Sequence, residues 1–295
     1  MVILTATYNH PKKLVQLYKS LLRQSTRDFK WIIVDDGSQE ETQTVVQKMA
    51  EESDIKIEYY YKENGGKGSA INLGLMHIQS EDEFVLFVDD DEELLDTALT
   101  TVNEYIKNYN NSECAVIHFN RMDNKGTIIA SPVISEDQIM SCQERKRKGY
   151  KQDGYTGYFV DKLTGYFFPI FEGERYIAPS VLFMTVCTKY KMVWAHAVIG
   201  KTEYLEGGIT KQGRKLRLKN PKGMFLYCTF MQAKESGLKL RFIYSVFGYA
   251  YLYYSGISIS DVTRNIKPYY SLNPCCKPLG LILSNYWEKK YNYHD

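Results

Sequence analysis

The first third of the chain alternates between short apolar runs and segments with an apolar residue at every third or fourth position. Short apolar runs are typical of buried strands, and the wider spacing is typical of helices that pack on one face. The runs predict strands at residues 2–8, 29–34, 55–61 and 84–88. Because a helical pattern follows each of them, we expect a mostly parallel sheet with helices on both faces.

Each predicted strand ends in a polar turn, and these turns carry the residues best suited to binding a ligand. In an open parallel sheet, ligands bind beyond the carboxyl ends of the strands. We therefore expect one crevice lined by Thr5, Tyr8, Asp36, Lys67, Asp89 and Asp91.

The rest of the chain predicts more strands and then helices. Strands are expected at residues 114–120, 192–199 and 202–205, a hairpin turn at 123–126, and helices at 94–109 and 179–190. The polar segment 135–151 predicts an excursion or mobile loop. From residue 223 onward the pattern indicates helices rich in tyrosine and phenylalanine, which we expect to pack on the protein rather than on a membrane.

Composition narrows the class of protein. The 295 residues carry a net charge of only +2, which gives no overall attraction to nucleic acid. The six cysteines lack the paired spacing of a zinc site, so we expect reduced and mostly buried thiols. The sequence has neither a signal-peptide pattern nor an apolar run long enough to span a bilayer. We therefore expect a cytoplasmic protein.

The segment EFVLFVDDDEELL, at residues 83–95, changes within one residue from an apolar strand to five consecutive acids. Acids in the first turn of a helix favour its dipole, which explains Asp91, Glu92 and Glu93. Asp89, at the end of a buried strand, is explained less well, because crowded carboxylates raise each other's pKa unless a cation lies between them. Magnesium or manganese is bound in this way, by carboxylates together with phosphate oxygens.

A phosphate ligand is suggested independently by the turn Asn64-Gly-Gly-Lys-Gly68. Its glycines would let backbone N–H groups approach an anion at a helix N-terminus, and Lys67 adds positive charge. The turn matches neither the P-loop nor the dinucleotide-binding pattern. Alone it is weak evidence, as is the acidic turn Asp35-Asp36-Gly37-Ser38, since such turns also serve simply to begin helices.

In combination these motifs are far more specific. The chain contains ILTATYN at 3–9, IIVDDGS at 32–38, ENGGKGSAINLGL at 63–75 and FVDDDE at 87–92. In this order they resemble the nucleotide-binding half of family-two inverting glycosyltransferases of the bacterial cell-surface polysaccharide type. The resemblance is specific over about residues 1–110 and thinner to about 225. It implies a GT-A-like α/β fold, a Rossmann-type mostly parallel sheet flanked by helices, with a C-terminal helical appendage.

The resemblance also implies roles for the first three motifs. Thr5 and Tyr8 would contact the nucleoside of a nucleotide-diphospho-sugar donor. Asp36 would hydrogen-bond the base, and Lys67 would lie near the diphosphate.

In the fourth motif the resemblance implies an Asp-x-Asp pair made of Asp89 and Asp91. Asp89 would point toward the ribose, and both carboxylates would lie at a Mn²⁺ or Mg²⁺ ion, with Asp91 as its main ligand. Asp90 occupies the variable position of the donor site, and we interpret it as a solvated acid. A cation there would stabilise the charge that develops on the leaving diphosphate.

A base must take the proton of the acceptor hydroxyl, and in the family an acidic pair before a helix often does so. The usual Glu-Asp pair is absent here, and the nearest equivalent is residues 171–176, FEGERY. Glu174 is the first candidate and Glu172 the second. The alternative is that these acids form only surface ion pairs with Arg175. Asp153 and Asp161 are further candidates without a matched motif.

The resemblance predicts a donor-binding half at residues 1–110, an acceptor-binding half at 111–222 and a helical region at 223–295. No Gln-x-x-Arg-Trp motif is present, which favours transfer of a single sugar over processive synthesis. UDP-sugar is the default donor, and the acceptor would be a saccharide or a lipid-linked molecule. The basic stretch 211–222 and the C-terminal helices would allow peripheral contact with the inner face of the membrane. The oligomeric state stays open.

Two other functions are compatible with acids, a metal and this type of sheet. A sugar nucleotidyltransferase should carry a glycine-rich basic loop after the first strand, where this chain has YNHPKK at residues 8–13. A non-catalytic nucleotide-sugar-binding protein would explain the absence of the usual base motif. Release of pyrophosphate would indicate the first, and binding without turnover would indicate the second.

Overall fold

The computed structural model describes residues 1–110, 112–202, 209–256, 258–260 and 270–291. The chain folds into two compact units. The sheet unit comprises Met1–Cys142, Gly149–Phe168 and Thr185–Glu203, and the helical unit comprises Gln143–Lys148, Pro169–Met184 and Tyr204–Asp295. These units are defined by packing alone, so the predicted division into donor, acceptor and helical regions stays a functional prediction.

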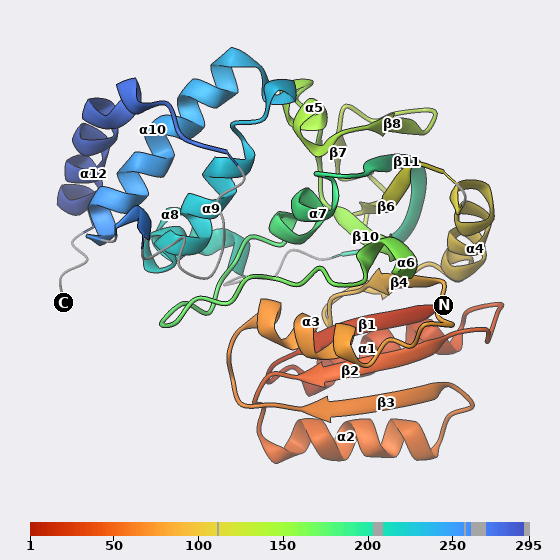
Figure 1. Cartoon of the computed structure of the whole chain (residues 1–295). Helices are drawn as coiled ribbons and strands as arrows, with labels where there is room; N and C mark the ends of the chain where they lie inside the picture. The colour runs from red at the N-terminus through yellow and green to blue at the C-terminus, as the bar shows by residue number, and fades with distance from the viewer. Residues whose placement is uncertain (111, 203–208, 257, 261–269, 292–295) are drawn as a thin grey trace. The chain divides into compact units, whose positions relative to one another are not determined.

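The first four strands confirm the predicted parallel arrangement (Figure 1). They are β1 (Val2–Thr7), β2 (Lys30–Asp35), β3 (Lys56–Tyr61) and β4 (Phe84–Phe87), in the spatial order β3-β2-β1-β4. The helices that connect them are α1 (Pro11–Leu22), α2 (Glu40–Glu51) and α3 (Lys67–Met76). All four carboxyl ends therefore lie at one edge of the sheet, as the crevice prediction requires.

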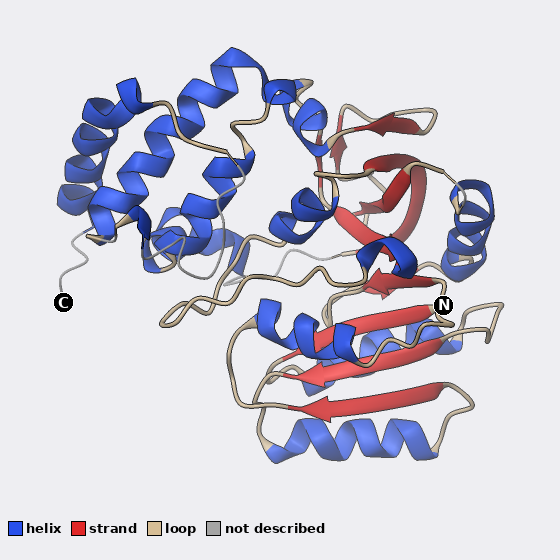
Figure 2. Cartoon of the chain, in the orientation of Figure 1, coloured by secondary structure: helices blue, strands red, loops and turns tan. Residues whose placement is uncertain are grey.

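The sheet continues with strands of both directions, as Figure 2 shows. Strand β10 (Gly154–Phe159) lies antiparallel between β4 and β6 (Cys114–Met122), and β11 (Lys191–Lys201) runs parallel to β6. Two short strands, β5 (Glu93–Leu94) and β8 (Gln138–Met140), pair antiparallel with β11. A separate small sheet joins β7 (Ala130–Ser131) to β9 (Lys151–Gln152). The remaining helices of the sheet unit are α4 (Ala98–Tyr109) and α6 (Val160–Leu163).

Two sequence predictions are corrected here, and a third falls almost entirely outside the described residues. The helix expected from residue 94 begins at Ala98, because residues 93 and 94 instead pair with Lys201 and Gly200. The segment 135–151 is not a loop throughout: it contains β8 and α5 (Cys142–Arg147). A short strand such as β8 depends on its pairing with β11 more than on its own pattern. Of the strand expected at 202–205, Thr202 lies outside any strand and the rest lies outside the described residues.

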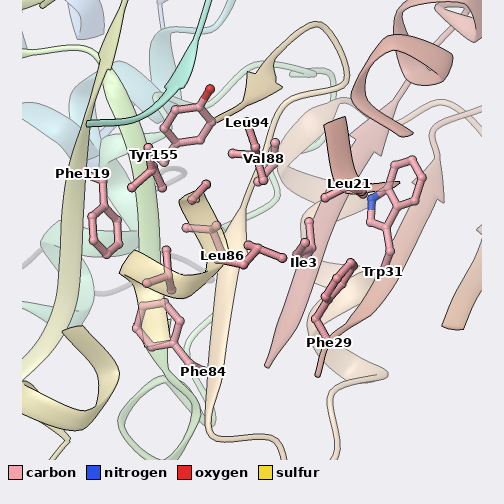
Figure 3. Packing of buried hydrophobic residues seen from close by; sticks show 14 of the residues in the cluster. Ile3, Leu21, Phe29, Trp31, Phe84, Leu86, Val88, Leu94, Phe119 and Tyr155 are labelled. Atoms are coloured by element: carbon pink, nitrogen blue, oxygen red, sulfur yellow. The ribbon is translucent and has the colours of Figure 1, made fainter. Parts of the chain in front are cut away.

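The core follows from strand alternation, which sends successive side chains to opposite faces of the sheet. Ile3, Trp31 and Ile33 point to the face that α1 and α2 cover, where they meet Leu14 and Leu17. Figure 3 shows this cluster, with Phe29 and Trp31 beside Ile3 and with Phe84 and Phe119 further along the sheet.

The aromatic residues of 155–171, together with Trp194, could serve either as platforms for sugar rings or as core. Tyr155, Tyr158 and Phe159 on β10 are at most 1% exposed, and so is Trp194 on β11. For these four residues the structure favours the core interpretation. Phe167, in contrast, is 43% exposed.

The helical unit confirms the helices predicted from residue 223. It contains α8 (Ile209–Lys219), α9 (Pro221–Phe230), η1 (Lys234–Ser236), α10 (Gly237–Ser255), η2 (Pro274–Cys276) and α12 (Lys277–Tyr291). The short helix α7 (Ser180–Val186) corresponds to the helix expected at 179–190. Among the helices that the structure describes, none combines the length and apolar character needed to cross a membrane. All six cysteines are free thiols and only Cys275 is exposed, as expected.

Part of the basic stretch 211–222 has an internal role. Arg214 donates a hydrogen bond from Nη1 to the Tyr251 hydroxyl at 2.7 Å. Its guanidinium lies 4.8 Å from the centroid of the Trp287 ring, a cation–π distance. Arg214 therefore ties α8 to α10 and α12 rather than facing an external anion.

Candidate functional site

The acidic turn after β2 is tied to the loop after β1. Asp35 is buried and accepts hydrogen bonds from Ser38 N and from the Tyr59 hydroxyl, both at 2.7 Å. Burial, reinforced by Asp35, raises the pKa of Tyr59. Ser38 Oγ accepts from Asn9 N at 2.8 Å, and Asn9 Oδ1 accepts from Gln39 N at 3.1 Å. The two loops are thus locked together beside the exposed Tyr8.

The second acid of the turn, Asp36, holds the glycine-rich turn after β3. It is 4% exposed and accepts hydrogen bonds from Lys62 Nζ at 2.8 Å, Gly65 N at 2.9 Å and Gly66 N at 2.7 Å. Gly37 permits this close approach, since a Cβ on it would lie 2.7 Å from Asn64 N. The N–H groups expected to approach a phosphate therefore already bind a carboxylate. Lys62, which the sequence analysis missed, is the only described cation hydrogen-bonded to Asp36.

Lys67 and Asp89 come together at the carboxyl edge of the sheet. Lys67 is the first residue of α3, and its Nζ donates to Asp89 Oδ1 at 2.5 Å. Both side chains are more than 40% exposed. Desolvation disfavours the charge of Lys67, but Asp89 outweighs this effect and raises the lysine pKa. A diphosphate at this edge would therefore meet an ammonium group that is already held in place.

Asp90 does not fit the interpretation as a solvated acid. It is 8% exposed, accepts a hydrogen bond from Thr7 Oγ1 at 2.7 Å and lies 3.3 Å from His10 Nδ1. The hydrogen bond with Asp90 raises the pKa of His10. Asp90 is thus directed back toward the end of β1 and the start of α1. The prediction that Asp90 is a solvated acid was wrong.

Glu92 and Glu93 also differ from expectation, because they do not begin a helix. Glu92 is buried and forms an ion pair with Arg121 on β6, which also pairs with Asp153. Glu93 is exposed in β5 and pairs with Arg23 at 2.5 Å. Arg121 was not expected from the sequence, where its only signal is a charged residue near the end of a largely apolar run.

The carboxylates after β4 are crowded enough to favour a cation. Burial, and then the negative charges of Asp89 and Asp90, raise the pKa of Asp91. Burial and Asp89 likewise raise the pKa of Glu92. The oxygen donors of Asp89 and Asp91 suit Mg²⁺ or Mn²⁺, which needs only one or two carboxylates when phosphate oxygens complete its shell. Within the described part of the chain, no three His, Cys, Asp or Glu residues form a complete metal cage.

Thr5 is placed differently from Tyr8. Thr5 is fully buried, and its hydroxyl accepts a hydrogen bond from Trp31 Nε1 at 3.0 Å. Tyr8 is 48% exposed just beyond β1. Thr5 is therefore suited to positioning Trp31, whereas Tyr8 is accessible to a ligand.

The two candidate bases lie in the helical unit and have unequal surroundings. Glu174 accepts hydrogen bonds from Lys222 N at 2.7 Å and Gly223 N at 3.0 Å, at the start of α9. Asn220 Oδ1 returns the contact by accepting from the backbone N–H of Arg175 and of Tyr176, both at 3.0 Å. Burial raises the pKa of Glu174 despite its two N–H donors. Glu172 has an exposed side chain.

Comparison with known proteins identifies a family. The family model described as Glycosyl transferase family 2 matches residues 2–173. A Campylobacter jejuni protein named GalNAc(5)-diNAcBac-PP-undecaprenol beta-1,3-glucosyltransferase is 35% identical over 100 residues, 34% of this chain and 32% of that protein. The Staphylococcus aureus poly(ribitol-phosphate) beta-N-acetylglucosaminyltransferase TarS is 33% identical over 109 residues, 35% of this chain and 19% of TarS. The matches thus span about a third and about a fifth of the length of these relatives.

Solved structures extend the likeness over the whole chain. The S. aureus TarS fragment 1-349 has a TM-score of 0.66 at 15% identity, covering 100% of this chain and 91% of that one. The same fragment has been solved in complex with UDP-GlcNAc. The mannosyltransferase PcManGT of Pyrobaculum calidifontis, solved with GDP-Man and Mn²⁺, has a TM-score of 0.58 at 13% identity, covering 99% and 87%. At these identities the likeness concerns the fold, and it confirms the predicted GT-A-like class.

Proposed function

The chain belongs to glycosyl transferase family 2, and from this premise we propose that it transfers one sugar from a nucleotide-diphospho-sugar to an acceptor hydroxyl with inversion. One observation carries the proposal: Asp36, Lys67 and Asp89–Asp91 converge on the carboxyl ends of β1–β4. This is where an open parallel sheet binds nucleotides.

Each group at this edge has a proposed task. Tyr8 lies open beside the first loop and would contact the nucleoside, with Asp36 near the base. Lys67 would exchange its contact with Asp89 for the diphosphate. Thr5 would act only indirectly, because its buried hydroxyl is bonded to Trp31 in the core.

Asp89 and Asp91 are proposed as the protein ligands of a Mn²⁺ or Mg²⁺ ion. Their crowding supports this, since the raised pKa of Asp91 reflects burial and negative neighbours that a cation would offset. Such an ion supplies charge stabilisation to the leaving diphosphate. The chain itself would hold the two carboxylates, with Asp90 and Thr7 fixing the turn between them.

The acceptor proton is proposed to pass to a glutamate of the 172–174 segment. Sequence alone favours Glu174 over Glu172, but both carboxylate oxygens of Glu174 accept backbone hydrogen bonds at the start of α9. We therefore place Glu172, whose side chain is exposed, first and Glu174 second. A base must reach the acceptor hydroxyl with a free lone pair.

The donor and acceptor follow from the relatives only as proposals. UDP-sugar is the proposed donor, since TarS has been solved with UDP-GlcNAc. A lipid-linked or other saccharide acceptor is proposed because the C. jejuni relative is named for an undecaprenol-linked substrate. Such an acceptor would require peripheral contact with the membrane.

The test is a thermal-shift and turnover panel of UDP- and GDP-sugars, with Mn²⁺, Mg²⁺ or chelator. We expect stabilisation by one nucleotide sugar and metal-dependent release of its nucleoside diphosphate. Asp91→Asn should lower turnover about thousandfold while the melting temperature stays the same or rises, because like-charge repulsion is relieved. Glu93→Gln, an exposed acid of the same segment, is the matched control and should keep its turnover.

Other outcomes would replace the proposal. Full turnover by Asp91→Asn would remove its metal-binding role. Pyrophosphate release from a nucleoside triphosphate and sugar phosphate would indicate a nucleotidyltransferase. Nucleotide-sugar binding without turnover on a broad acceptor panel would indicate a binding protein.

A further inference from the structure

The outward faces of α10 and α12 form an apolar groove within the helical unit. The two helices lie side by side in Figures 1 and 2 and contact each other along their length. The groove is lined by Phe242, Val246 and Phe247 of α10 and by Leu279, Ile282 and Tyr286 of α12. Phe242 is 50% exposed, Ile282 64% and Tyr286 52%. Such a patch marks an interaction surface when it is contiguous.

This face is distinct from the face that holds the helices together. Gly280, Ser284 and Trp287 are the buried residues of α12, and they recur at helical spacing. The backbones approach closely at Gly280, where a Cβ would lie 2.4 Å from Tyr249 Cβ. Leu279, Ile282 and Tyr286 form a second stripe at the same spacing. A second apolar stripe is not needed for the contact with α10.

Basic residues flank the groove. The segments 234–256 and 274–291 contain six lysine or arginine residues and two glutamates. Lys239 lies one turn before Phe242 and Ile243 on α10. Lys290 lies one turn after Tyr286 on α12, with Nζ 5.4 Å from the centroid of the Tyr286 ring. Glu288 falls with Leu281 on a different face of α12, by helical spacing.

We propose that this surface, the α10–α12 face, rests on the anionic surface of a lipid bilayer. Apolar side chains between exposed lysines match the boundary between acyl chains and negative headgroups, where tyrosine and lysine can keep their polar ends in water. A second copy of the chain would instead bring the same lysines against one another. The inference rests on the proposed function, because it gives that enzyme its route to a lipid-linked acceptor.

The test is sedimentation of the full chain with vesicles of phosphatidylglycerol and phosphatidylethanolamine, and with vesicles of phosphatidylcholine alone. We expect binding to the anionic vesicles that weakens as salt is raised. Ile282→Asp should lower the vesicle partition coefficient by about tenfold or more, because it removes apolar burial and adds a negative charge. Leu281→Asp is the matched control: the same change on the same helix, 48% exposed but away from the groove, should bind like the wild type.

Charge and apolar contributions are separated by Lys239→Gln and Lys290→Gln, each expected to weaken binding about fivefold at low salt. Thermal unfolding checks that each variant is folded. Absence of vesicle binding by the wild type, or equal losses in Ile282→Asp and Leu281→Asp, would overturn the inference. So would a dimer in sedimentation velocity that Ile282→Asp dissociates, because the face would then cover a second copy.

The outcome is independent of the donor reaction. Release of nucleoside diphosphate from the donor in the absence of vesicles should be the same in Ile282→Asp and the wild type. Loss of vesicle binding by Ile282→Asp, together with normal donor turnover, would confirm that the α10–α12 face binds the bilayer. Vesicle binding in a protein that turns over no nucleotide sugar would support the surface while refuting the proposed function.

Discussion

The acids after β4 and Glu174, whose carboxylate lies at the start of α9, have opposite surroundings. After β4, Asp89–Glu92 supply four successive carboxylates, and their mutual repulsion contributes to the raised pKa of Asp91. Glu174 stands between two backbone N–H donors at a helix start, and the pKa of this residue is raised mainly by burial. Crowded carboxylates favour a nearby cation, whereas a carboxylate that accepts backbone N–H donors stabilises the start of a helix.

The largest expected effect on stability is at Arg121, a cation that the protein itself supplies to the crowded acids after β4. Arg121 pairs with Glu92 and Asp153 and is only 9% exposed. Arg121→Met would leave Glu92 buried beside Asp89, so we expect a loss of about 3 kcal/mol in the free energy of unfolding. Urea denaturation measures it.

The matched control is Arg23, which also bridges two acids, Glu93 and Asp96, but with a side chain that is 44% exposed. Arg23→Met should cost no more than about 1 kcal/mol, since exposed ion pairs contribute little. The double variant Arg121→Met with Glu92→Gln should recover part of the loss. Equal losses of unfolding free energy at Arg121 and Arg23 would contradict the view that the buried Arg121 pair matters more for stability than the exposed Arg23 pair.

The next largest effect separates the contributions of Glu174 and Glu172 to stability and to turnover. Glu174→Gln replaces one of the two acceptor oxygens at the start of α9, so we expect a loss of about 1 kcal/mol in the free energy of unfolding. Turnover should stay within about threefold. Glu172→Gln should show the reverse, with unchanged stability and turnover lowered by about a hundredfold or more.

These variants are read by thermal unfolding and by steady-state kinetics on the same preparations. The control for the helix start is Asn220→Ala, which removes the reciprocal acceptor for Arg175 N and Tyr176 N. It should lower stability as Glu174→Gln does. A hundredfold loss of turnover in Glu174→Gln at unchanged stability would instead make Glu174 the base.

The sheet edge could be predicted from sequence because its signals are local. The four apolar runs and the spacing of the following helices determine which turns share an edge, so Asp36, Lys67 and Asp89 were expected together. The orientation of each acid depends instead on distant residues. Asp90 is directed inward by Thr7, more than eighty positions away, and no local pattern indicates that contact.

The same reason explains why two other contacts could not be predicted. Strand β5 exists because Leu94 and Glu93 pair with β11, about a hundred residues later. The Glu174 carboxylate meets N–H groups of Lys222 and Gly223, which belong to a helix that begins at Pro221. An acid followed by a helix indicates a catalytic candidate in sequence, and the hydrogen-bond partners that decide how free its oxygens are become visible only in the structure.

The smallest effect concerns Asp137, a carboxylate that the protein satisfies by itself. It accepts hydrogen bonds from the Tyr105 hydroxyl at 2.7 Å, the Tyr109 hydroxyl at 2.9 Å and His196 N at 3.0 Å, and its Oδ1 lies 2.8 Å from His196 Nδ1. Burial alone would raise the pKa of Asp137, but these donors outweigh it and hold the pKa below the ordinary value. Asp137 thus shows the opposite shift to Asp91.

Because the folded-state pKa of Asp137 lies below that of the unfolded chain, its contribution to stability is present above the unfolded pKa and is lost as the pH falls through the folded value. Asp137→Asn keeps one acceptor oxygen, so it should destabilise the protein by only about 0.5–1 kcal/mol at neutral pH, and the gap from the wild type should close in acid. Urea denaturation across the acid range measures it, with the exposed neighbour Glu136→Gln as the control. A gap that stays constant or widens as the pH falls would show that the cluster does not depend on ionised Asp137, and the contrast with the crowded acids after β4 would fail.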